Sequence, residues 1–303
     1  MAISRSQLVK ELEPGLNALF GLEYKRYENQ HSEIYNEESS DRAFEEEVML
    51  SGFANAQVKG EGSGVSFDEA QETFTARYTH ETVALAFAIT EEAIEDNLYD
   101  RLASRYTKAL ARSMSNAKQV KSVEPLIQGL PTTNNFDSGD GVSLFNTDHP
   151  TVAGTFANTL ATQADLNETS LEQSMIDIAQ MTDERGLRIA ARGVKMIIPS
   201  ELQFTAERLM KSQGRTGTAD NDINAIVSMG MVPQGYRVNN YLTDSDAFYI
   251  LTDIPNGMKM FNRAPLTTAM EGDFDTGNVR YKARERYSFG VSDPRGIFGV
   301  EGA

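Results

Sequence analysis

The 303-residue chain contains no cysteine and only three histidines, His31, His80 and His149. The absence of cysteine excludes disulfide scaffolds, thiolate metal sites and cysteine nucleophiles. Three histidines leave little material for a catalytic metal site built on imidazole ligands. The sequence therefore predicts neither a bound metal nor another cofactor.

Positive charge is also scarce. The chain has 28 lysines and arginines against 44 aspartates and glutamates, which gives a net charge of −16 at pH 7. General binding to nucleic acid requires clustered cations, so this composition argues against tight contact with phosphates. No run of 18 apolar residues occurs, and residues 1–20 lack a basic start followed by an apolar stretch. We therefore expect no membrane-spanning segment and no signal peptide.

Residues 1–47 are interpreted as an N-terminal arm. Apolar residues recur at helical spacing between residues 8 and 20, but Pro14 and Gly15 are expected to interrupt the pattern. Residues 23–47 are strongly polar. Two interpretations stay open: a solvated segment that packs weakly on its own domain, or an arm that becomes ordered only against a neighbouring chain.

Residues 48–82 are expected to form a long two-stranded excursion. Residues 48–53 are one candidate strand, and residues 74–79 alternate apolar and polar side chains with the period of a β-strand. Three glycines within residues 59–64 (KGEGSG) predict a flexible turn between them. Because an isolated two-stranded ribbon is marginal in water, the ribbon is expected to lie on its own domain or on another subunit.

The strongest local pattern is a long helix with Thr90 as its candidate N-cap. Apolar residues then recur at steps of three or four as far as residue 120. Acidic residues occupy the first turns, and residues 101–121 hold basic residues and no acid, which suits the helix dipole. A helix of about 30 residues would be roughly 45 Å long. Its basic stripe could meet an acidic partner or a phosphate backbone, but a solvated or internally paired face is the favoured interpretation.

Residues 144–150 (LFNTDHP) hold a candidate acid–base pair, Asp148 and His149. Neighbours in sequence need not point the same way, and no serine nucleophile motif accompanies them. The favoured interpretation is a structural turn of Asp148, His149 and Pro150, in which Asp148 bonds to nearby backbone and Pro150 stiffens the chain. In the preceding loop, Asp137 and Asp140 resemble a calcium loop, but their spacing does not match the EF-hand pattern.

Residues 150–270 mix short helices and strands, with helices predicted at 170–185 and 200–211, a strand at 194–198 and a mobile surface loop at 213–220. Residues 279–291 alternate again, and one side of this strand is almost entirely basic. Because like charges on one strand repel, opposing acids are expected. The acidic arm, a neighbouring subunit and nucleic acid are the candidate sources, and pairing within the protein is favoured. The basic residues are Arg280, Lys282, Arg284 and Arg286.

The order of these parts resembles the major capsid protein of tailed bacteriophages with the Hong Kong 97-type fold, and more narrowly the Mu-like major head subunit family. The resemblance covers most of the chain. The stretches that carry it are the excursion at 48–78 with the strand at 83–89 and the long helix, LFNTDHP at 144–150, GVKMIIP at 193–199, FYIL at 248–251, FNRAP at 261–265 and RYSFGVSDPRGIFG at 286–299.

The resemblance implies an α+β fold with an N-terminal arm, an extended loop, a long spine helix, and peripheral and axial domains. The implied boundaries are an arm at 1–47, an extended loop at 48–82, a peripheral domain with the spine helix at 83–155, an axial domain at 156–262 and a return to the peripheral domain at 263–303. The loop near residues 214–220 would then lie close to the axis of a capsomer.

The resemblance also implies a function. The chain would self-assemble into pentamers and hexamers of an icosahedral shell that encloses phage double-stranded DNA without sequence-specific binding. Other implied partners are a portal, a separate scaffolding protein and a cement protein, and the implied location is the virion, assembled in the bacterial host cytoplasm. No catalytic residue is expected. The alternatives are an encapsulin-like nanocompartment shell and a hydrolase that uses Asp148 and His149.

Six charged residues are the candidates for subunit contact. Some members of the resembled family crosslink a lysine of the extended loop to an asparagine of a neighbour, and Lys59 lies in the corresponding loop here. Neither the asparagine nor the assisting acid can be matched here, so this chemistry is not carried over. The six candidates are Lys59, Glu61, Arg77, Arg280, Arg284 and Arg286.

Overall fold

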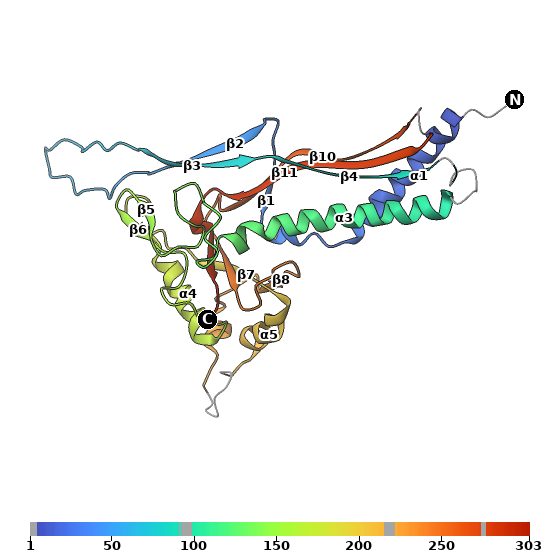
Figure 1. Cartoon of the computed structure of the whole chain (residues 1–303). Helices are drawn as coiled ribbons and strands as arrows, with labels where there is room; N and C mark the ends of the chain where they lie inside the picture. The colour runs from blue at the N-terminus through green and yellow to red at the C-terminus, as the bar shows by residue number, and fades with distance from the viewer. Residues whose placement is uncertain (1–4, 91, 93–98, 215–221, 274–276) are drawn as a thin grey trace.

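Two four-stranded sheets occupy different parts of the molecule (Figure 1). The computed structural model describes residues 5–90, 92, 99–214, 222–273 and 277–303. The long sheet has the order β1 (Asn36–Ser39), β10 (Met258–Gly272), β11 (Val279–Val291) and β4 (Glu81–Ile89). The short sheet has the order β12 (Ile297–Val300), β9 (Phe248–Thr252), β7 (Gly193–Ile198) and β8 (Tyr236–Val238).

The remaining elements are helices and two separate hairpins. None of the described helices combines the length and apolar character that crossing a bilayer requires. The helices are α1 (Arg5–Arg26), α3 (Tyr99–Gln128), α4 (Glu168–Gln180), α5 (Gln203–Lys211) and α6 (Ala225–Met229), with 3-10 turns at Gln30–Glu33, Ser200–Leu202 and Pro294–Gly296. The hairpins pair β2 (Phe44–Leu50) with β3 (Glu72–Thr79), and β5 (His149–Thr151) with β6 (Gly154–Phe156).

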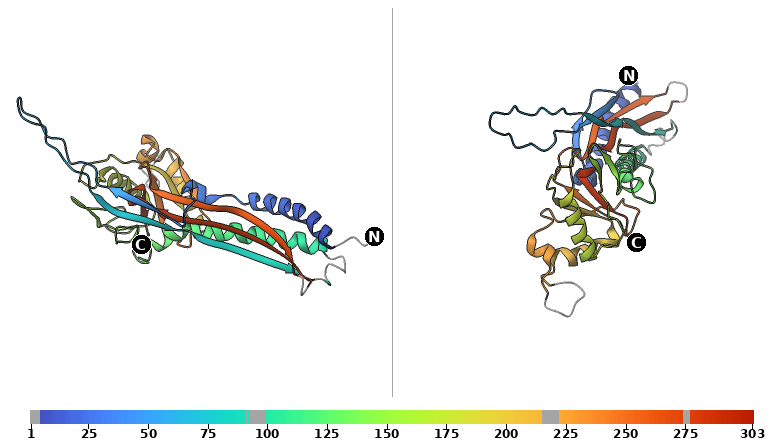
Figure 2. Two further views of the ribbon diagram at one scale, coloured as in Figure 1. Left: turned by 90° about the horizontal axis from the view of Figure 1, so that it is seen from above. Right: turned by 90° about the vertical axis from the view of Figure 1, so that its left-hand side faces the viewer.

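The predicted long helix is present as α3, which runs along the long sheet beside α1 (Figure 2). Its described part has 30 residues and ends at Gln128, beyond the predicted end. The predicted N-cap, Thr90, would bond to the backbone of the residues that follow it. Of these, residues 91 and 93–98 lie outside the described residues, so the capping role stays a prediction. Leu110 and Met114 of α3 pack against Tyr281 and Ala283 of β11. The inward face of β11 thus follows the predicted alternation, because every second side chain points at the helix.

The predicted interruption at Pro14 and Gly15 is wrong, since α1 is one helix from Arg5 to Arg26. Phe20 is buried against β11 and α3, and Asn17 Oδ1 accepts hydrogen bonds from Tyr281 (2.8 Å) and Thr268 (2.7 Å). An internal proline removes one backbone hydrogen bond and disfavours a helix locally. Here the packing of the following turns outweighs that local cost.

The N-terminal segment continues to pack on its own chain beyond α1. Ile34 and Tyr35 are buried in the central core, and the Tyr35 hydroxyl donates to the Ser122 carbonyl oxygen at 2.6 Å. Strand β1 then pairs in parallel with β10. Residues 14–39 are therefore neither weakly packed nor dependent on a neighbour for order, contrary to both interpretations of the sequence.

The short sheet forms the core of a separate, more compact body. Leu171 and Ile178 of α4 pack with Met196, Ile250 and Phe298 of the sheet. Helix α4 ends at Gln180 and not at the predicted residue 185, because a turn bridged between Thr182 and Arg188 follows it. The strand predicted at 194–198 is confirmed as β7, and the helix predicted at 200–211 appears as a 3-10 turn followed by α5. Most of the predicted surface loop, residues 215–221, lies outside the described residues.

Candidate functional site

The hairpin of β2 and β3 leads into a long loop that projects from the body (Figures 1 and 2). Strand pairing ends near Leu50 and Glu72, so residues 51–71 contain no strand. Within this loop Val58 is 100% exposed and Phe67 is 97% exposed. Fully exposed apolar side chains on a projecting loop are typical of a surface that a partner covers.

The two predicted contact residues at the loop tip, Lys59 and Glu61, are both exposed. No ion pair reaches either of them from the described part of the chain. The loop has few anchors to the body, one of which is the Arg185 guanidinium that donates to the Glu69 carbonyl oxygen at 2.5 Å. Both charged groups at the tip are thus free to meet a partner.

Arg77 lies on β3, at the root of the loop. Its guanidinium is 3.7 Å from Glu46 Oε1 and 4.1 Å from the centre of the Phe44 ring, both on the paired strand β2. These contacts stabilise the ribbon from within one chain. The side chain stays half exposed, so contact with another subunit remains a prediction.

The predicted basic face of β11 forms an exposed row of cations, Arg280, Lys282 and Arg284, which we call the cationic row. Arg280 pairs with Asp273 of the same hairpin. No carboxylate of the described residues pairs with Lys282 or Arg284. Small residues of β4 lie directly beside the row: Arg280 is opposite Ala88, Lys282 is opposite Ala86 and Arg284 is opposite Ala84.

The acidic arm is one candidate source of opposing acids, but none of its described carboxylates pairs with the cationic row, and Arg280 has its partner within the chain in Asp273. The arm's carboxylates turn instead to Lys259, whose ammonium group lies 2.5 Å from Glu47 Oε1 and 3.2 Å from Glu38 Oε1. Burial alone would lower the pKa of Lys259, but these two carboxylates outweigh it and raise the pKa. Arg286 contacts the arm through the Ala43 carbonyl oxygen, at 3.5 Å.

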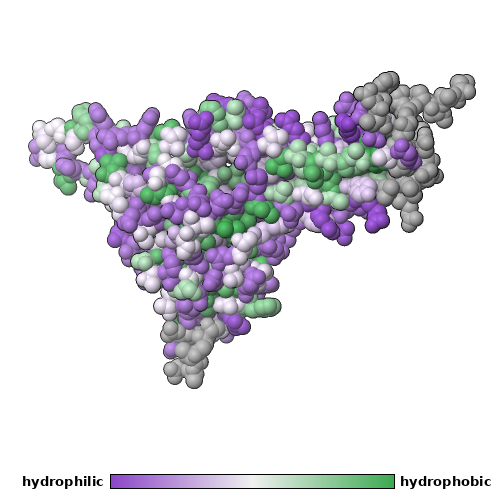
Figure 3. All heavy atoms as spheres, viewed as in Figure 1, coloured by the Kyte–Doolittle hydropathy of each residue, from purple (hydrophilic) through white to green (hydrophobic). Residues whose placement is uncertain are grey.

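Strand β4 is an edge of the long sheet, and its sequence from 82 to 89 carries no charge. Ala84, Ala86 and Ala88 are exposed, and Leu85 is 48% exposed. Figure 3 shows the resulting apolar band along the long part of the molecule. An apolar edge strand with unpaired backbone groups is a template for association with another chain. Ala84, Ala86 and Ala88 of this band lie directly beside the cationic row and share its face of the long sheet, whereas Leu85 points to the opposite face.

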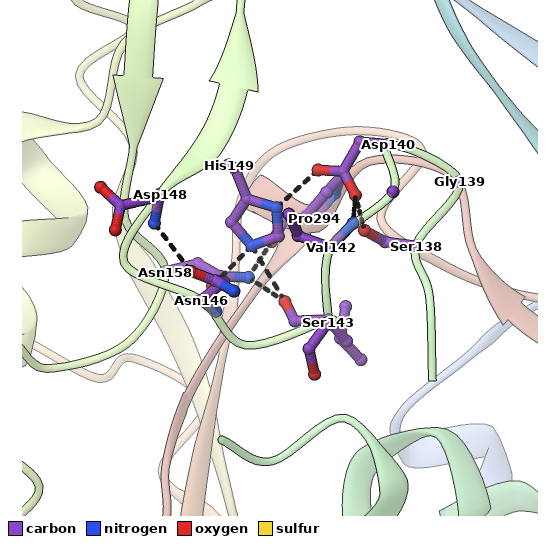
Figure 4. Close-up of polar contacts among 12 residues, drawn as sticks. Ser138, Gly139, Asp140, Val142, Ser143, Asn146, Asp148, His149, Asn158 and Pro294 are labelled. Atoms are coloured by element: carbon purple, nitrogen blue, oxygen red, sulfur yellow. Dashed lines mark hydrogen bonds and ion pairs between the residues drawn. The ribbon is translucent and has the colours of Figure 1, made fainter. Parts of the chain in front are cut away.

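The predicted turn around His149 is a buried polar cluster and not an open site (Figure 4). His149 is 0% exposed, and its Nδ1 lies 2.6 Å from Asp140 Oδ2. Its Nε2 lies 3.0 Å from Asn158 Oδ1 and 3.2 Å from the Leu144 carbonyl oxygen. Burial alone would raise the pKa of Asp140, but hydrogen bonds from His149 and Ser138 together lower it.

Asp148 takes no part in this cluster and points away from His149 (Figure 4). Its backbone N–H donates to Asn146 Oδ1 at 2.9 Å, and its carboxylate accepts from the Thr147 hydroxyl at 3.0 Å, a side-chain partner in place of the predicted backbone one. Hydrolysis by an Asp148–His149 pair therefore has no geometric support. Pro150 follows in β5, the first strand of the short hairpin.

Sequence reasoning missed the true partners of His149. Asp140 is nine residues away and Asn158 is nine residues on the other side, and no spacing rule links them. Asp140 had been considered only as part of a calcium loop. Among the described residues, no group of three or more histidines and carboxylates could hold a metal ion.

Comparison with known proteins completes the description. The sequence pattern of the phage capsid protein family matches residues 72–300. No curated protein sequence matches the chain. Because the family match spans most of the chain, it includes β4, β10 and β11 of the long sheet, α3, the His149 cluster and the short sheet.

Solved structures share the fold at low sequence identity. The capsid of an empty GTA particle has a TM-score of 0.56 at 12% identity, covering 91% of each chain. The capsid of Myoviridae phage XM1 has a TM-score of 0.52 at 13% identity, covering 89% of each chain. A virus-like particle from Pyrococcus furiosus has a TM-score of 0.53 at 11% identity, covering 94% of this chain and 98% of that one. The predicted α+β capsid fold is thereby confirmed.

Proposed function

The chain belongs to the phage capsid protein family as a major capsid protein, and we propose that its copies form pentamers and hexamers of an icosahedral shell around double-stranded DNA. The proposal includes a virion location, assembly in the bacterial host cytoplasm, and portal, scaffolding and cement proteins as partners. The narrower kinship with Mu-like head subunits stays a prediction.

The observation that carries the proposal is the exposure of apolar side chains on the projecting loop. Burying a side chain such as Val58 or Phe67 contributes roughly 1.5–3 kcal/mol, and within one chain the loop gains none of it. In a shell, every subunit has neighbours that can cover such a loop. Repeated heterologous contacts around an axis close into rings.

The surface of the long sheet suits this loop chemically. Residues 54–72 contain one cation, Lys59, against four acids, Glu61, Asp68, Glu69 and Glu72. The cationic row offers opposite charge, and the adjoining apolar band of β4 offers cover for Val58 and Phe67. We place the loop of one subunit on this surface of the next, which makes Lys59, Glu61, Arg280 and Arg284 members of one interface.

A charge exchange tests this assignment. We expect wild-type protein to form closed particles in electron micrographs and light scattering, with a scaffolding protein supplied where it is required. Glu61→Lys/Glu69→Lys should reduce particle yield at least tenfold, and Lys282→Glu/Arg284→Glu should do the same. Combining all four changes should restore assembly. Leu22→Ser, an exposed apolar change on α1, is the control that should assemble normally.

The outcome separates two claims. If wild-type chain stays monomeric under all these conditions, the shell function is wrong. If particles form but the combined exchange restores nothing, only the loop placement is wrong.

A nanocompartment shell is the second candidate, because the fold is shared with a virus-like particle from Pyrococcus furiosus as well as with phage capsids. Native particles distinguish the two functions by their contents. Nuclease-protected double-stranded DNA supports the phage shell, whereas a packaged enzyme supports the nanocompartment.

A further inference from the structure

Every polar atom that contacts the His149 ring is a hydrogen-bond acceptor (Figure 4). Nδ1 faces the Asp140 carboxylate, and Nε2 faces the Leu144 carbonyl oxygen and Asn158 Oδ1. A neutral imidazole has one N–H and one lone pair, so either tautomer would aim a lone pair at an acceptor. Only the doubly protonated ring satisfies both sides.

The orientation of the Asn158 amide is fixed by three other hydrogen bonds. Its Nδ2 donates to the Leu144 carbonyl oxygen at 2.7 Å and to the Pro294 carbonyl oxygen at 3.0 Å. Its Oδ1 also accepts from the Asn146 backbone N–H at 2.9 Å. Turning the amide over to offer His149 a donor would break all three bonds. The side chain therefore stays an acceptor toward His149.

We propose that His149 is held as an imidazolium ion, and that its charge clamps the 137–149 loop to Asn158 and the Pro294 turn, so that this junction loosens as pH rises. These contacts lie between the hairpin of β2 and β3 and the short sheet. On one side Gly139 lies against the backbone of Thr75, at the root of the projecting loop. On the other, the Gly299 N–H of β12 donates to the Asn158 carbonyl oxygen at 3.0 Å.

The charged groups around the ring favour its positive form. The His149 ring stacks on Phe156 at 4.8 Å, and the Arg295 guanidinium lies 4.1 Å from the centre of the same Phe156 ring. Arg295 is itself balanced by Glu184 at 2.6 Å and by Asp293 at 3.3 Å. With His149 protonated, the cluster holds two cations and three carboxylates, counting Asp140. Loss of the proton leaves one cation against the same three carboxylates.

Asp140→Asn is the decisive variant because it supplies a donor where wild type has only acceptors. The carbonyl oxygen of the introduced amide can keep the bonds from Ser138 and the Val142 N–H, while its NH2 group donates to His149 Nδ1. A neutral His149 with a proton on Nε2 is then fully satisfied. Asp148→Asn removes a carboxylate of the neighbouring residue that does not touch the ring, and it serves as the matched control.

Nitrogen-15 spectra of histidine-labelled full-length protein, as subunit or as assembled particle, measure the protonation directly. His31 and His80, the only other histidines, are internal references because burial lowers the pKa of each. At pH 7.5 we expect two protonated nitrogens at His149 and one at each reference. In Asp140→Asn, His149 should show one protonated nitrogen, and in Asp148→Asn it should match wild type.

A second readout is the unfolding midpoint as pH is raised. If the charge of His149 holds the junction together, the folded chain loses stability when that charge is lost. The wild-type midpoint should fall as His149 loses its second proton, and the His149-linked part of that fall should be absent in Asp140→Asn. A singly protonated His149 in folded wild type at pH 7.5 would overturn the proposal, whatever the variants do. So would an unchanged doubly protonated ring in folded Asp140→Asn.

Discussion

The N-terminal segment and the projecting loop are both polar, but they behave oppositely. The segment from residue 14 to 39 buries Leu16, Phe20, Ile34 and Tyr35 on its own chain. The loop at 51–71 leaves its apolar side chains in solvent. The difference teaches that average polarity does not decide whether a segment packs. A few apolar residues at the spacing of a helix face are sufficient, because they enter a core together.

Backbone pairing separates the two segments as well. Strand β1 of the N-terminal segment adds to the long sheet beside β10, so its N–H and C=O groups gain partners. The loop continues for about twenty residues without a strand. Its glycines permit many conformations, and ordering them costs entropy that only a partner's contacts can offset. The loop is thus the part of the chain that we propose is completed by assembly.

The largest expected difference comes from removing one phenylalanine in each segment. Phe20→Ala should lower the free energy of unfolding by about 3–5 kcal/mol, because Phe20 is 2% exposed and its loss leaves a cavity. Phe67→Ala should change it by less than about 0.5 kcal/mol yet reduce particle yield. Urea unfolding of the subunit and particle counts in micrographs measure the two effects. Equal loss of stability in both variants would contradict the claim that the N-terminal segment is packed and the projecting loop is not.

A smaller effect is expected from the Tyr35 hydroxyl. Tyr35→Phe removes its bond to the Ser122 carbonyl oxygen and should cost about 0.5–1.5 kcal/mol of stability. The same change at Tyr106, which is half exposed on α3, should be nearly neutral. Thermal unfolding of both variants under identical conditions provides the measurement. If the two substitutions have the same effect, the packing of the N-terminal segment is weaker than its contacts suggest.

The smallest effect is a pH dependence of the same segment. Burial, and secondly the nearby Lys118 ammonium, lower the pKa of His31. The unfolded chain therefore takes up the proton first, so stability linked to His31 is complete above about pH 6.5 and declines as pH falls. His31→Gln should flatten this part of the stability profile. Protection factors for amide exchange at β1, corrected for the intrinsic pH dependence of exchange, report it locally, and a protection factor in wild type that does not change as pH falls would refute it.

Local structure could be predicted from the sequence wherever the pattern within a single helix or strand was sufficient. The alternation of β11, the presence of a long helix at α3 and the strand at 194–198 all reflect periodic burial that a single element displays. The exposure of Lys59 and Glu61 followed from the glycines around them. Pro14 misled the prediction, because a local preference was given more weight than the burial of the next helical turns.

The partners of charged groups could not be predicted in the same way. Lys259 meets Glu47 and Glu38 from more than 200 residues away, and His149 meets Asp140 and not its neighbour Asp148. Periodicity states which face of an element is buried, but it says nothing of which other element lies against that face.

The sequence by itself determined that cysteine chemistry is absent, where the long helix and several of the strands lie, and which sides of these elements are apolar. The tertiary structure alone decided that the N-terminal segment packs on its own chain, that no described carboxylate pairs with Lys282 or Arg284 of the cationic row, and that His149 faces three acceptors. The physical reason is the distance along the chain over which each kind of interaction acts. Propensity and alternation act between residues a few positions apart, whereas these contacts join distant segments that only the packed core brings together.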